Sequence, residues 1–199
     1  LQDGCETSRK VIPPKWLWDG TSREWTRQDG QKPLLIGTDC SGMEAPIQAI
    51  RGLGITYQHS FSSDNNPDCE TTIRANYPPD IFYKDITTRD NTAAPKVDVY
   101  VAGFPCQSFS TAGKQQGFAD QRGRGTIFFD VLDYIDKQRP KIFVLENVKG
   151  LVQLDHGKCL KIILDALQGV GDGVYEIHHK VLNTKDLGIP QNRDRWYCV

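Results

Sequence analysis

The sequence predicts a doubly wound α/β fold: a mostly parallel sheet between layers of helices, with an antiparallel pair of strands at one end. Two observations lead to this prediction. Short apolar runs rich in β-branched residues alternate with amphipathic segments of helical length, the pattern of successive βαβ units. The chain has 199 residues, enough for one domain with a real core and too few for two comfortable ones.

The first half of the predicted domain begins with an apolar strand at 34–36, a Gly/Ser turn and a short helix at 45–51. Gly52 and Gly54 close that helix, a common use of glycine at helix ends. Three further elements follow in order, a strand at 55–62, a helix at 64–76 and a short strand at 81–86. This order, strand then helix, is what a parallel sheet requires.

The second half continues the alternation with a strand at 98–102 and a helix at 126–138. The helix is predicted because its apolar residues recur at helical spacing, namely Phe128, Val131, Leu132 and Ile135. The remaining elements are a fully apolar strand at 142–145, an amphipathic helix at 158–168 and two strands at 174–181 and 195–199. The last two strands are typical of an antiparallel pair that finishes such a sheet.

Residues 1–33 differ from the rest: they contain three tryptophans and a Pro-Pro pair, and their apolar residues follow no sustained helical or strand spacing. We interpret them as an N-terminal extension, either a tail packed on the domain or a partner-binding arm. Residues 34–199 form the predicted folded domain. Because the chain begins at Leu1 and stops inside an apparent strand, we expect a fragment or processed piece, truncated on its C-terminal side.

Composition excludes some classes and leaves others open. With 24 basic and 25 acidic side chains, net charge does not point to a nucleic-acid partner, although a local basic surface is compatible with it. The six cysteines form no Cys-x-x-Cys pair, so neither a zinc site nor a disulfide framework is indicated, and a reducing intracellular compartment fits best. No leader and no apolar run near the roughly 20 residues needed to cross a bilayer is present, so the sequence does not support secretion or membrane insertion.

The octapeptide 103–110, Gly-Phe-Pro-Cys-Gln-Ser-Phe-Ser, follows directly after the apolar run 97–102. Phe104-Pro105 stiffens the exit from the strand, since proline fixes its own φ and keeps its predecessor extended. Cys106 is therefore expected at the carboxyl rim of the sheet, where such folds place their chemistry. Taken alone, the thiol could instead be a buried structural cysteine.

Other strand ends bring polar groups to the same rim. Glu146-Asn147 follows the strand at 142–145, and a turn containing Gly42 follows the first strand. Arg193 and Arg195 lie on one side of the chain if it is extended, and can fix an anion or lower the pKa of a thiol. The alternatives are a helix-capping role for Glu146 and surface ion pairs for the two arginines.

Five motifs carry a family resemblance in their order and spacing: Gly103–Ser110, Gly113–Phe118, Glu146–Val148, Val181–Pro190 and Gln191–Arg195. They resemble those of the cytosine-5 DNA methyltransferases, and the similarity runs from about Leu34 to Val199. The resemblance implies a Rossmann-like methyltransferase fold that uses S-adenosylmethionine, releases S-adenosylhomocysteine and needs no metal.

The resemblance also implies a mechanism. Cys106 would add to C6 of a cytosine flipped out of double-stranded DNA, which activates C5 to accept the methyl group. Glu146 would hydrogen-bond N3 and the exocyclic amine of the base. Arg193 and Arg195 would hold the nucleotide and the catalytic groups in place.

Binding residues are carried over position by position. Asp64 matches the acidic position that binds ribose hydroxyls, and Asp64 and Asp85 could otherwise be turn-forming residues. The implied cofactor-binding residues are Cys40, Ser41, Gly42, Met43, Glu44, Asp64, Asn65, Asp85, Ile86 and Pro105. The implied DNA-binding residues are Gln107, Ser110, Lys114, Arg122 and Arg124, in and beside a segment similar to the mobile loop of the family.

The first turn departs from the family pattern. Cys40 stands where a stacking phenylalanine is common, and Glu44-Ala45 replaces two glycines. Either Glu44 binds the amino group of the cofactor in compensation, or affinity for the cofactor is reduced. The altered turn makes a catalytically degenerate scaffold subunit one alternative function. An RNA cytosine-5 methyltransferase of the same fold, as in the tRNA-modifying branch of the family, is the other. A separate polypeptide or a segment beyond Val199 is expected to supply target recognition.

Overall fold

The computed structural model describes residues 32–105 and 126–199. They contain a seven-stranded sheet with the order β3-β2-β1-β4-β5-β7-β6. The strands are β1 (Leu34–Asp39), β2 (Tyr57–Ser63), β3 (Ile81–Tyr83), β4 (Val99–Ala102), β5 (Ile142–Val148), β6 (His179–Asn183) and β7 (Asp194–Cys198). Strands β1 to β5 are parallel to one another, whereas β7 runs antiparallel to both β5 and β6. The predicted doubly wound α/β fold with an antiparallel end is confirmed.

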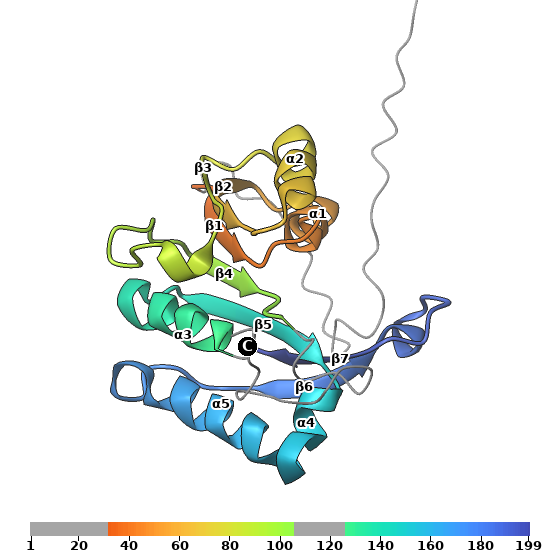
Figure 1. The fold of residues 1–199 in the computed structure, drawn as a ribbon. Coiled ribbons are helices and arrows are strands. Elements are labelled where there is room, and N and C mark those ends of the chain that lie inside the picture. The colour runs from red at the N-terminus through yellow and green to blue at the C-terminus, as the bar shows by residue number, and fades with distance from the viewer. Residues whose placement is uncertain (1–31, 106–125) are drawn as a thin grey trace, which may run out of the picture.

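Helices cover the sheet on both faces (Figure 1). They are α1 (Ala45–Gly52), α2 (Pro67–Asn76), α3 (Ile127–Gln138), α4 (Gly150–Gln153) and α5 (Lys158–Gly169), with single 3₁₀ turns at Ile86–Thr88, Leu154–Gly157, Val170–Asp172 and Thr184–Leu187. The main core cluster joins α3 and α5 to β4, β5 and β7. Ile47 of α1 and Ile73 of α2 are fully buried outside that cluster, which indicates that α1 and α2 cover the opposite face.

Several predicted boundaries were wrong. The third strand ends at Tyr83, because Asp85 accepts a hydrogen bond from the Thr87 amide and starts a 3₁₀ turn. The segment from 174 to 178 is not a strand, and β6 begins only at His179. The second helix starts at Pro67, since the side chain of Asn66 caps it, instead of at residue 64.

Gly37 marks a close approach inside the sheet. A Cβ built on it would lie 2.2 Å from Cε1 of Phe61, at the irregularity where β1 shifts register against β2. The Phe61 ring is itself confined, with ring centroids of Tyr134 and Tyr83 at 5.2 Å and 6.0 Å. Only glycine fits at this position without moving the aromatic side chains beneath it.

We expect Gly37→Ala to lower the free energy of unfolding by about 1–3 kcal/mol, the usual cost of overpacking a core. Urea unfolding measures the effect. Gly52→Ala is the matched control, because a Cβ there meets nothing within 4 Å. Equal stability of the two variants would contradict the close approach.

None of the helices between residues 32 and 105 or between 126 and 199 has the length and apolar character needed to cross a bilayer. The predicted N-terminal extension lies outside the described residues except for its last two, and the division at residue 33 stays a prediction.

Candidate active site

The strand order reverses between β1 and β4, since the chain continues from β1 outward to β2 and β3 and then returns to the other side of β1. In open α/β sheets, ligands bind at the carboxyl ends of the strands at such a point. The turn after β1 and the segment after β4 therefore meet where a ligand site is expected. Those predicted site residues that the structure describes all lie along this edge or at the ends of the neighbouring strands.

The turn after β1 has an unusual backbone. Cys40, Gly42 and Glu44 have φ values of 52°, 56° and 58°, alternating with residues of ordinary conformation. Two non-glycine residues in the left-handed region cost on the order of 1–3 kcal/mol each, so surrounding contacts must hold the turn.

Neighbouring strand ends supply those contacts. The Ser41 amide donates to the Ser63 carbonyl at 3.0 Å, and the Gly42 amide donates to Oδ2 of Asp64 at 2.8 Å. A Cβ built on Gly42 would meet nothing within 4 Å, so open space adjoins the turn beside the Asp64 carboxylate. Met43 is 73% exposed. The turn thus offers a glycine-lined surface next to an acceptor group.

Glu44 lies on the inner side of the turn. It is fully buried, and its Oε1 accepts hydrogen bonds from Thr38 Oγ1 at 2.7 Å and from Ser62 Oγ. The same oxygen is 3.4 Å from Nε2 of His59. Glu44 therefore supports the turn from within, and its predicted contact with a cofactor stays a prediction.

The Cys40 thiol is not set up as a nucleophile. Burial raises its pKa far above the ordinary value, and the carboxylates of Asp39 and Asp64 raise it further. A thiol that stays protonated is a poor nucleophile, so the predicted place of Cys40 beside the cofactor would depend on its shape and backbone.

The next two strand ends carry the remaining predicted cofactor positions. Asp64 directly follows β2, and Asn65 beside it is exposed. Asp85 is exposed at the start of the 3₁₀ turn, whereas Ile86 is only 6% exposed and packs into the core cluster. The polar groups of these strand ends face outward, and Ile86 anchors its loop.

Glu146 lies inside β5, and the prediction that it follows the strand was wrong. β5 continues to Val148 because its last residues pair with antiparallel β7, Glu146 opposite Tyr197 and Val148 opposite Arg195. This pairing puts Arg195 diagonally across from Glu146 on one face. Arg195 Nε lies 2.9 Å from Glu146 Oε1.

Two opposing effects act on the Glu146 carboxyl group. Burial raises its pKa above the ordinary value, and the positive charges of Arg195 and Arg193 oppose that shift. Arg193 itself is exposed. A raised pKa keeps more of a carboxyl group protonated at a given pH, which suits it to donate a hydrogen bond or a proton.

Three strand ends converge at Gly103. A Cβ built there would lie 3.6 Å from Oε2 of Glu146 and 3.9 Å from the carbonyl oxygen of Cys40. The Gly103 amide donates to the Asp39 carbonyl at 3.4 Å. The segment that leads to Cys106 thus starts between the first turn and Glu146.

Asn147 fixes the next residue of that segment. It is fully buried, and its Nδ2 donates to the Phe104 carbonyl at 3.3 Å, one residue before the half-buried Pro105. Its Oδ1 accepts from the Val148 amide at 2.8 Å. The side chain therefore ties the end of β5 to the Phe-Pro-Cys segment.

We expect Asn147→Asp to lower the free energy of unfolding by about 1–3 kcal/mol, because aspartate cannot donate to the Phe104 carbonyl and puts a carboxylate in a fully buried position beside that oxygen. Thermal unfolding measures the loss. Asn76→Asp is the matched control, since Nδ2 of Asn76 donates to the Thr72 carbonyl at 2.8 Å on the surface. A loss no larger than that of the control would show that the buried bond matters little.

Six of the predicted residues lie outside the described residues and stay predictions: Cys106, Gln107, Ser110, Lys114, Arg122 and Arg124. Within the described ranges, no group of three or more His, Cys, Asp or Glu side chains could hold a metal ion.

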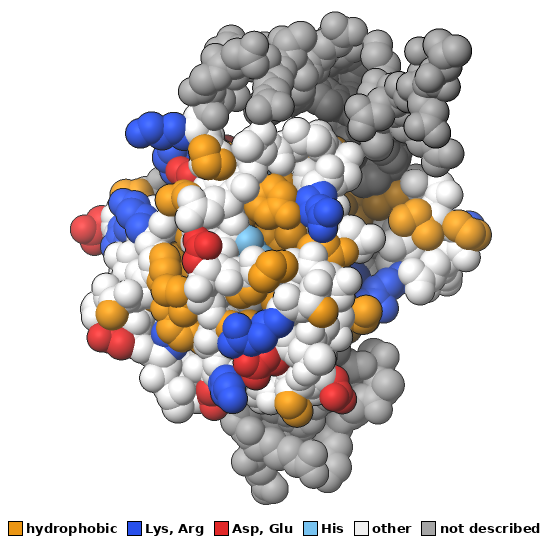
Figure 2. Space-filling view, turned by 90° about the horizontal axis from the view of Figure 1, so that it is seen from above, with side chains coloured by type: hydrophobic (Ala, Val, Ile, Leu, Met, Phe, Trp, Pro, Cys, Tyr) orange, Lys and Arg blue, Asp and Glu red, His pale blue; other side chains and the backbone are white. Residues whose placement is uncertain are grey.

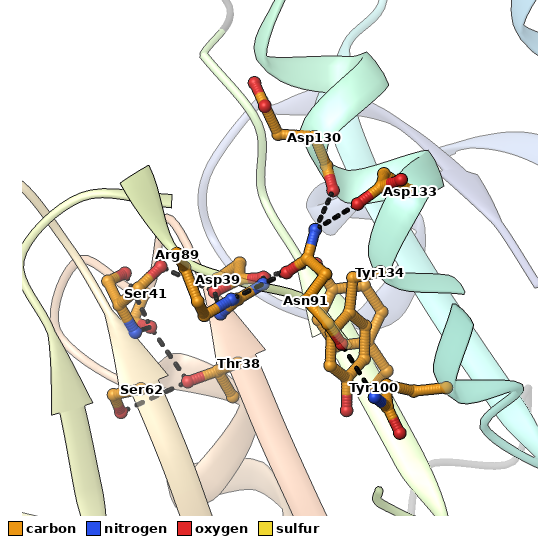
Figure 3. A network of polar contacts seen from close by, with 12 residues as sticks. Thr38, Asp39, Ser41, Ser62, Arg89, Asn91, Tyr100, Asp130, Asp133 and Tyr134 are labelled. Atoms are coloured by element: carbon orange, nitrogen blue, oxygen red, sulfur yellow. Dashed lines mark hydrogen bonds and ion pairs between the residues drawn. The ribbon is translucent and has the colours of Figure 1, made fainter. Parts of the chain in front are cut away.

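The sequence did not reveal one feature of the site, a buried ion pair between Asp39 and Arg89. Figure 3 shows it at the end of β1, linked to Tyr100 and Asn91. An isolated arginine in a loop has no period or motif, so no signal in a single sequence could single it out.

On the face shown in Figure 2, which carries the helices at the top of Figure 1, acidic and basic side chains are interspersed with apolar ones. No single-sign patch of the kind that attracts phosphates dominates the described part of this face.

Comparison with known proteins agrees with this arrangement. The model of the family "C-5 cytosine-specific DNA methylase" matches residues 39–199. The type II methyltransferase M.NlaIV of Neisseria lactamica is 43% identical over 159 residues, 76% of this chain and 36% of that protein. The type II methyltransferase M.HpaII of Haemophilus parainfluenzae is 45% identical over 141 residues, 70% and 38% of the two chains. The chain thus spans little more than a third of the length of these relatives.

Two solved structures share the fold. The S. pombe Dnmt2 methyltransferase superposes with a TM-score of 0.65 at 19% identity, over 84% of this chain and 49% of the other. The Entamoeba histolytica methyltransferase EhMeth gives 0.65 at 20% identity, over 84% and 52%. With the family model matching most of the chain and the strand ends converging on Gly103 and Glu146, the chain belongs to the C-5 cytosine-specific DNA methylase family.

Proposed function

We propose that the protein transfers a methyl group from S-adenosylmethionine to C5 of cytosine in DNA, through a covalent bond between Cys106 and C6 of a flipped base. The observation that carries this proposal is the position of Glu146, held by Arg195 beside Gly103, three residues before Cys106. Thiol and carboxyl group would thus act on one small ring.

The residues account for the chemistry as follows. The Cys106 thiolate forms a bond to C6, and the ring electrons move to C5, which becomes nucleophilic. The carboxyl group of Glu146 donates to N3 and accepts from the exocyclic amine, stabilising the negative charge of the adduct. C5 would form a bond to the methyl carbon of S-adenosylmethionine as the methyl–sulfur bond breaks, and its electrons leave with S-adenosylhomocysteine. A base then removes the C5 proton, the C6–sulfur bond breaks, and the thiolate leaves with its electrons as the C5–C6 double bond returns.

The described residues fit S-adenosylmethionine, which when bound supplies a methyl group on positively charged sulfur. The open space at Gly42 adjoins Asp64, whose carboxylate would accept from ribose hydroxyls. The other residues proposed to line this site are Cys40, Ser41, Met43, Glu44, Asn65, Asp85, Ile86 and Pro105.

Double-stranded DNA is the proposed partner, and the protein would act on it inside the cell. Reaching C6 in a stacked duplex requires that the nucleotide be flipped out. Arg193 would hold the flipped nucleotide, and Gln107, Ser110, Lys114, Arg122 and Arg124 would contact the DNA. A further segment or a second polypeptide would read the target sequence.

The test is methyl transfer by the full-length protein. A pool of duplexes of random sequence is incubated with S-adenosylmethionine labelled in the methyl group, beside a matched RNA pool. We expect label in DNA as 5-methylcytosine, identified by mass spectrometry of the nucleosides. Label in RNA alone would replace DNA by RNA as the substrate, and label in neither pool would contradict the proposal.

One observation favours a scaffold function as the second candidate. Glu44 occupies a left-handed position where glycine is common in the family, and its carboxylate is buried. A scaffold would bind S-adenosylhomocysteine undetectably in calorimetry while remaining folded. Micromolar binding would exclude a scaffold that has lost its cofactor site.

A further inference from the structure

A fully buried ion pair lies at the carboxyl end of β1. Both terminal nitrogens of Arg89 donate to Asp39, Nη1 to Oδ1 and Nη2 to Oδ2, each at 2.7 Å. The side chains are 1% and 0% exposed. Such a bidentate pair fixes the direction of the guanidinium as well as its distance.

Every remaining group of the pair has a partner. Asp39 also accepts from Tyr100 Oη and from Ser63 Oγ, both at 2.5 Å, and Arg89 Nε donates to Asn91 Oδ1 at 2.8 Å. Burial lowers the pKa of Arg89, but the hydrogen bonds and charge of Asp39 outweigh burial and raise it above its ordinary value. The guanidinium therefore stays charged, and each nitrogen of the guanidinium and each oxygen of the carboxylate has a hydrogen-bond partner.

Three aromatic rings form a cage around the guanidinium. The ring centroids of Phe61, Tyr83 and Tyr134 lie 5.0, 5.1 and 5.1 Å from Cζ of Arg89. Asn91 in turn donates to Oδ2 of Asp133 at 2.8 Å, which joins the loop to α3 (Figure 3). The cage and the hydrogen bonds together restrict the orientation of the guanidinium.

Stability alone does not explain such a pair, because well-packed apolar residues of similar size are often as stabilising as a buried ion pair. What the pair does is to join segments that are far apart in the sequence. Asp39 belongs to β1 and Arg89 follows the 3₁₀ turn at Ile86–Thr88, 50 positions later.

The joined segments are those that border the proposed methyl-donor site. Cys40 follows Asp39 directly, Ser63 precedes Asp64, and Arg89 lies four residues after Asp85. The Asp39 carbonyl accepts from the Gly103 amide, which begins the segment leading to Cys106. Asp39 and Arg89 thus contact or adjoin the ends of β1, β2, β3 and β4.

We propose that Asp39 and Arg89 are positioning residues, which hold the turn at Cys40–Glu44 and the loop at Asp85 in the arrangement that binds the methyl donor. This inference rests on the proposed function for its ligand. Neither side chain touches the donor, since both are buried beneath the strand ends.

The test compares Arg89→Lys with Arg74→Lys in the full-length protein. Lysine at position 89 keeps the charge but loses the bidentate fork and the bond to Asn91. Arg74→Lys is the matched control, because it makes the same change in a surface pair, where Arg74 Nε lies 2.9 Å from Oε1 of Glu70 and the arginine side chain is 55% exposed. Calorimetry with S-adenosylhomocysteine gives the affinity, and hydrogen exchange without ligand gives the protection of the Ser41 and Gly42 amides.

We expect Arg89→Lys to weaken S-adenosylhomocysteine binding about tenfold, which corresponds to a loss of about 1.4 kcal/mol in binding free energy. Exchange at Ser41 and Gly42 should be faster in this variant, whereas the control keeps wild-type affinity and exchange. Unchanged affinity and exchange in Arg89→Lys, or equal losses in both variants, would overturn the inference.

The failure of the positioning role can be told apart from the failure of the proposed function. If the wild-type protein does not bind S-adenosylhomocysteine, the proposed function fails in its cofactor, and the positioning role for donor binding fails with it. If the wild type binds and Arg89→Lys binds equally well with unchanged exchange, only the positioning role fails.

Discussion

Cys106→Ala is expected to abolish covalent trapping of the protein on a duplex that contains 5-fluorocytosine. In the proposed mechanism the Cys106 thiolate adds to C6, and C5 is then methylated. Release of the thiolate requires that the hydrogen on C5 leave as a proton. In the trapped base fluorine takes the place of this hydrogen, and fluorine cannot leave as a cation. The adduct should therefore accumulate in the wild type, visible as a protein–DNA band stable to denaturation, and alanine has no nucleophile to form it.

The matched control for this experiment is Cys159→Ala. Cys159 is a buried cysteine on α5 that belongs to the core cluster and to none of the strand ends that form the site. Its variant should trap DNA as the wild type does. An adduct that survives Cys106→Ala would assign the nucleophile elsewhere, and no adduct in the wild type would contradict covalent catalysis altogether. S-adenosylmethionine must be present, since trapping follows methyl transfer.

The order of elements was predictable because it is encoded locally. Apolar runs and helical spacing indicated each strand and each longer helix, and the antiparallel end was confirmed by the pairing of β5, β7 and β6. The errors lie where side-chain capping or pairing decided a boundary. Asp85 starts a turn where a strand was predicted, and β7 extends β5 past Glu146.

The site was only partly predictable. Motifs pointed to Glu146, Asn147 and the arginines near the end of the chain, because these residues stand in short, ordered patterns. Asp39 and Arg89 are 50 positions apart, and their contact depends on how β1 meets the loop after β3. Long-range contacts of this kind leave no trace in one sequence, although Asp39 lies beside the turn that the motifs marked.

The turn after β1 is supported on both faces of the sheet. Thr38 faces the Glu44 and Ser62 side chains, and the next residue, Asp39, faces Arg89 and Tyr100. Successive residues of a strand point to opposite faces, so the two networks do not share side chains. This double support explains how two left-handed, non-glycine residues persist in the turn.

Glu146→Gln is expected to lower the rate of methyl transfer by about 10²–10⁴-fold, the range for loss of a general acid or base. Glutamine keeps the size of the side chain and can still hydrogen-bond the base, but it has no proton to give to N3. In the wild type, burial raises the pKa of Glu146, which favours the protonated form that this donation needs.

DNA binding should change far less than the rate, because the duplex is held mainly through its phosphates. Single-turnover methylation and a gel-shift titration on the same duplex separate the two effects. Glu176→Gln is the matched control, since Glu176 is 86% exposed and pairs with His178, outside the strand end that holds Glu146. Equal losses of rate and binding in Glu146→Gln would contradict the assigned role, since a residue that only binds the nucleotide would affect both alike.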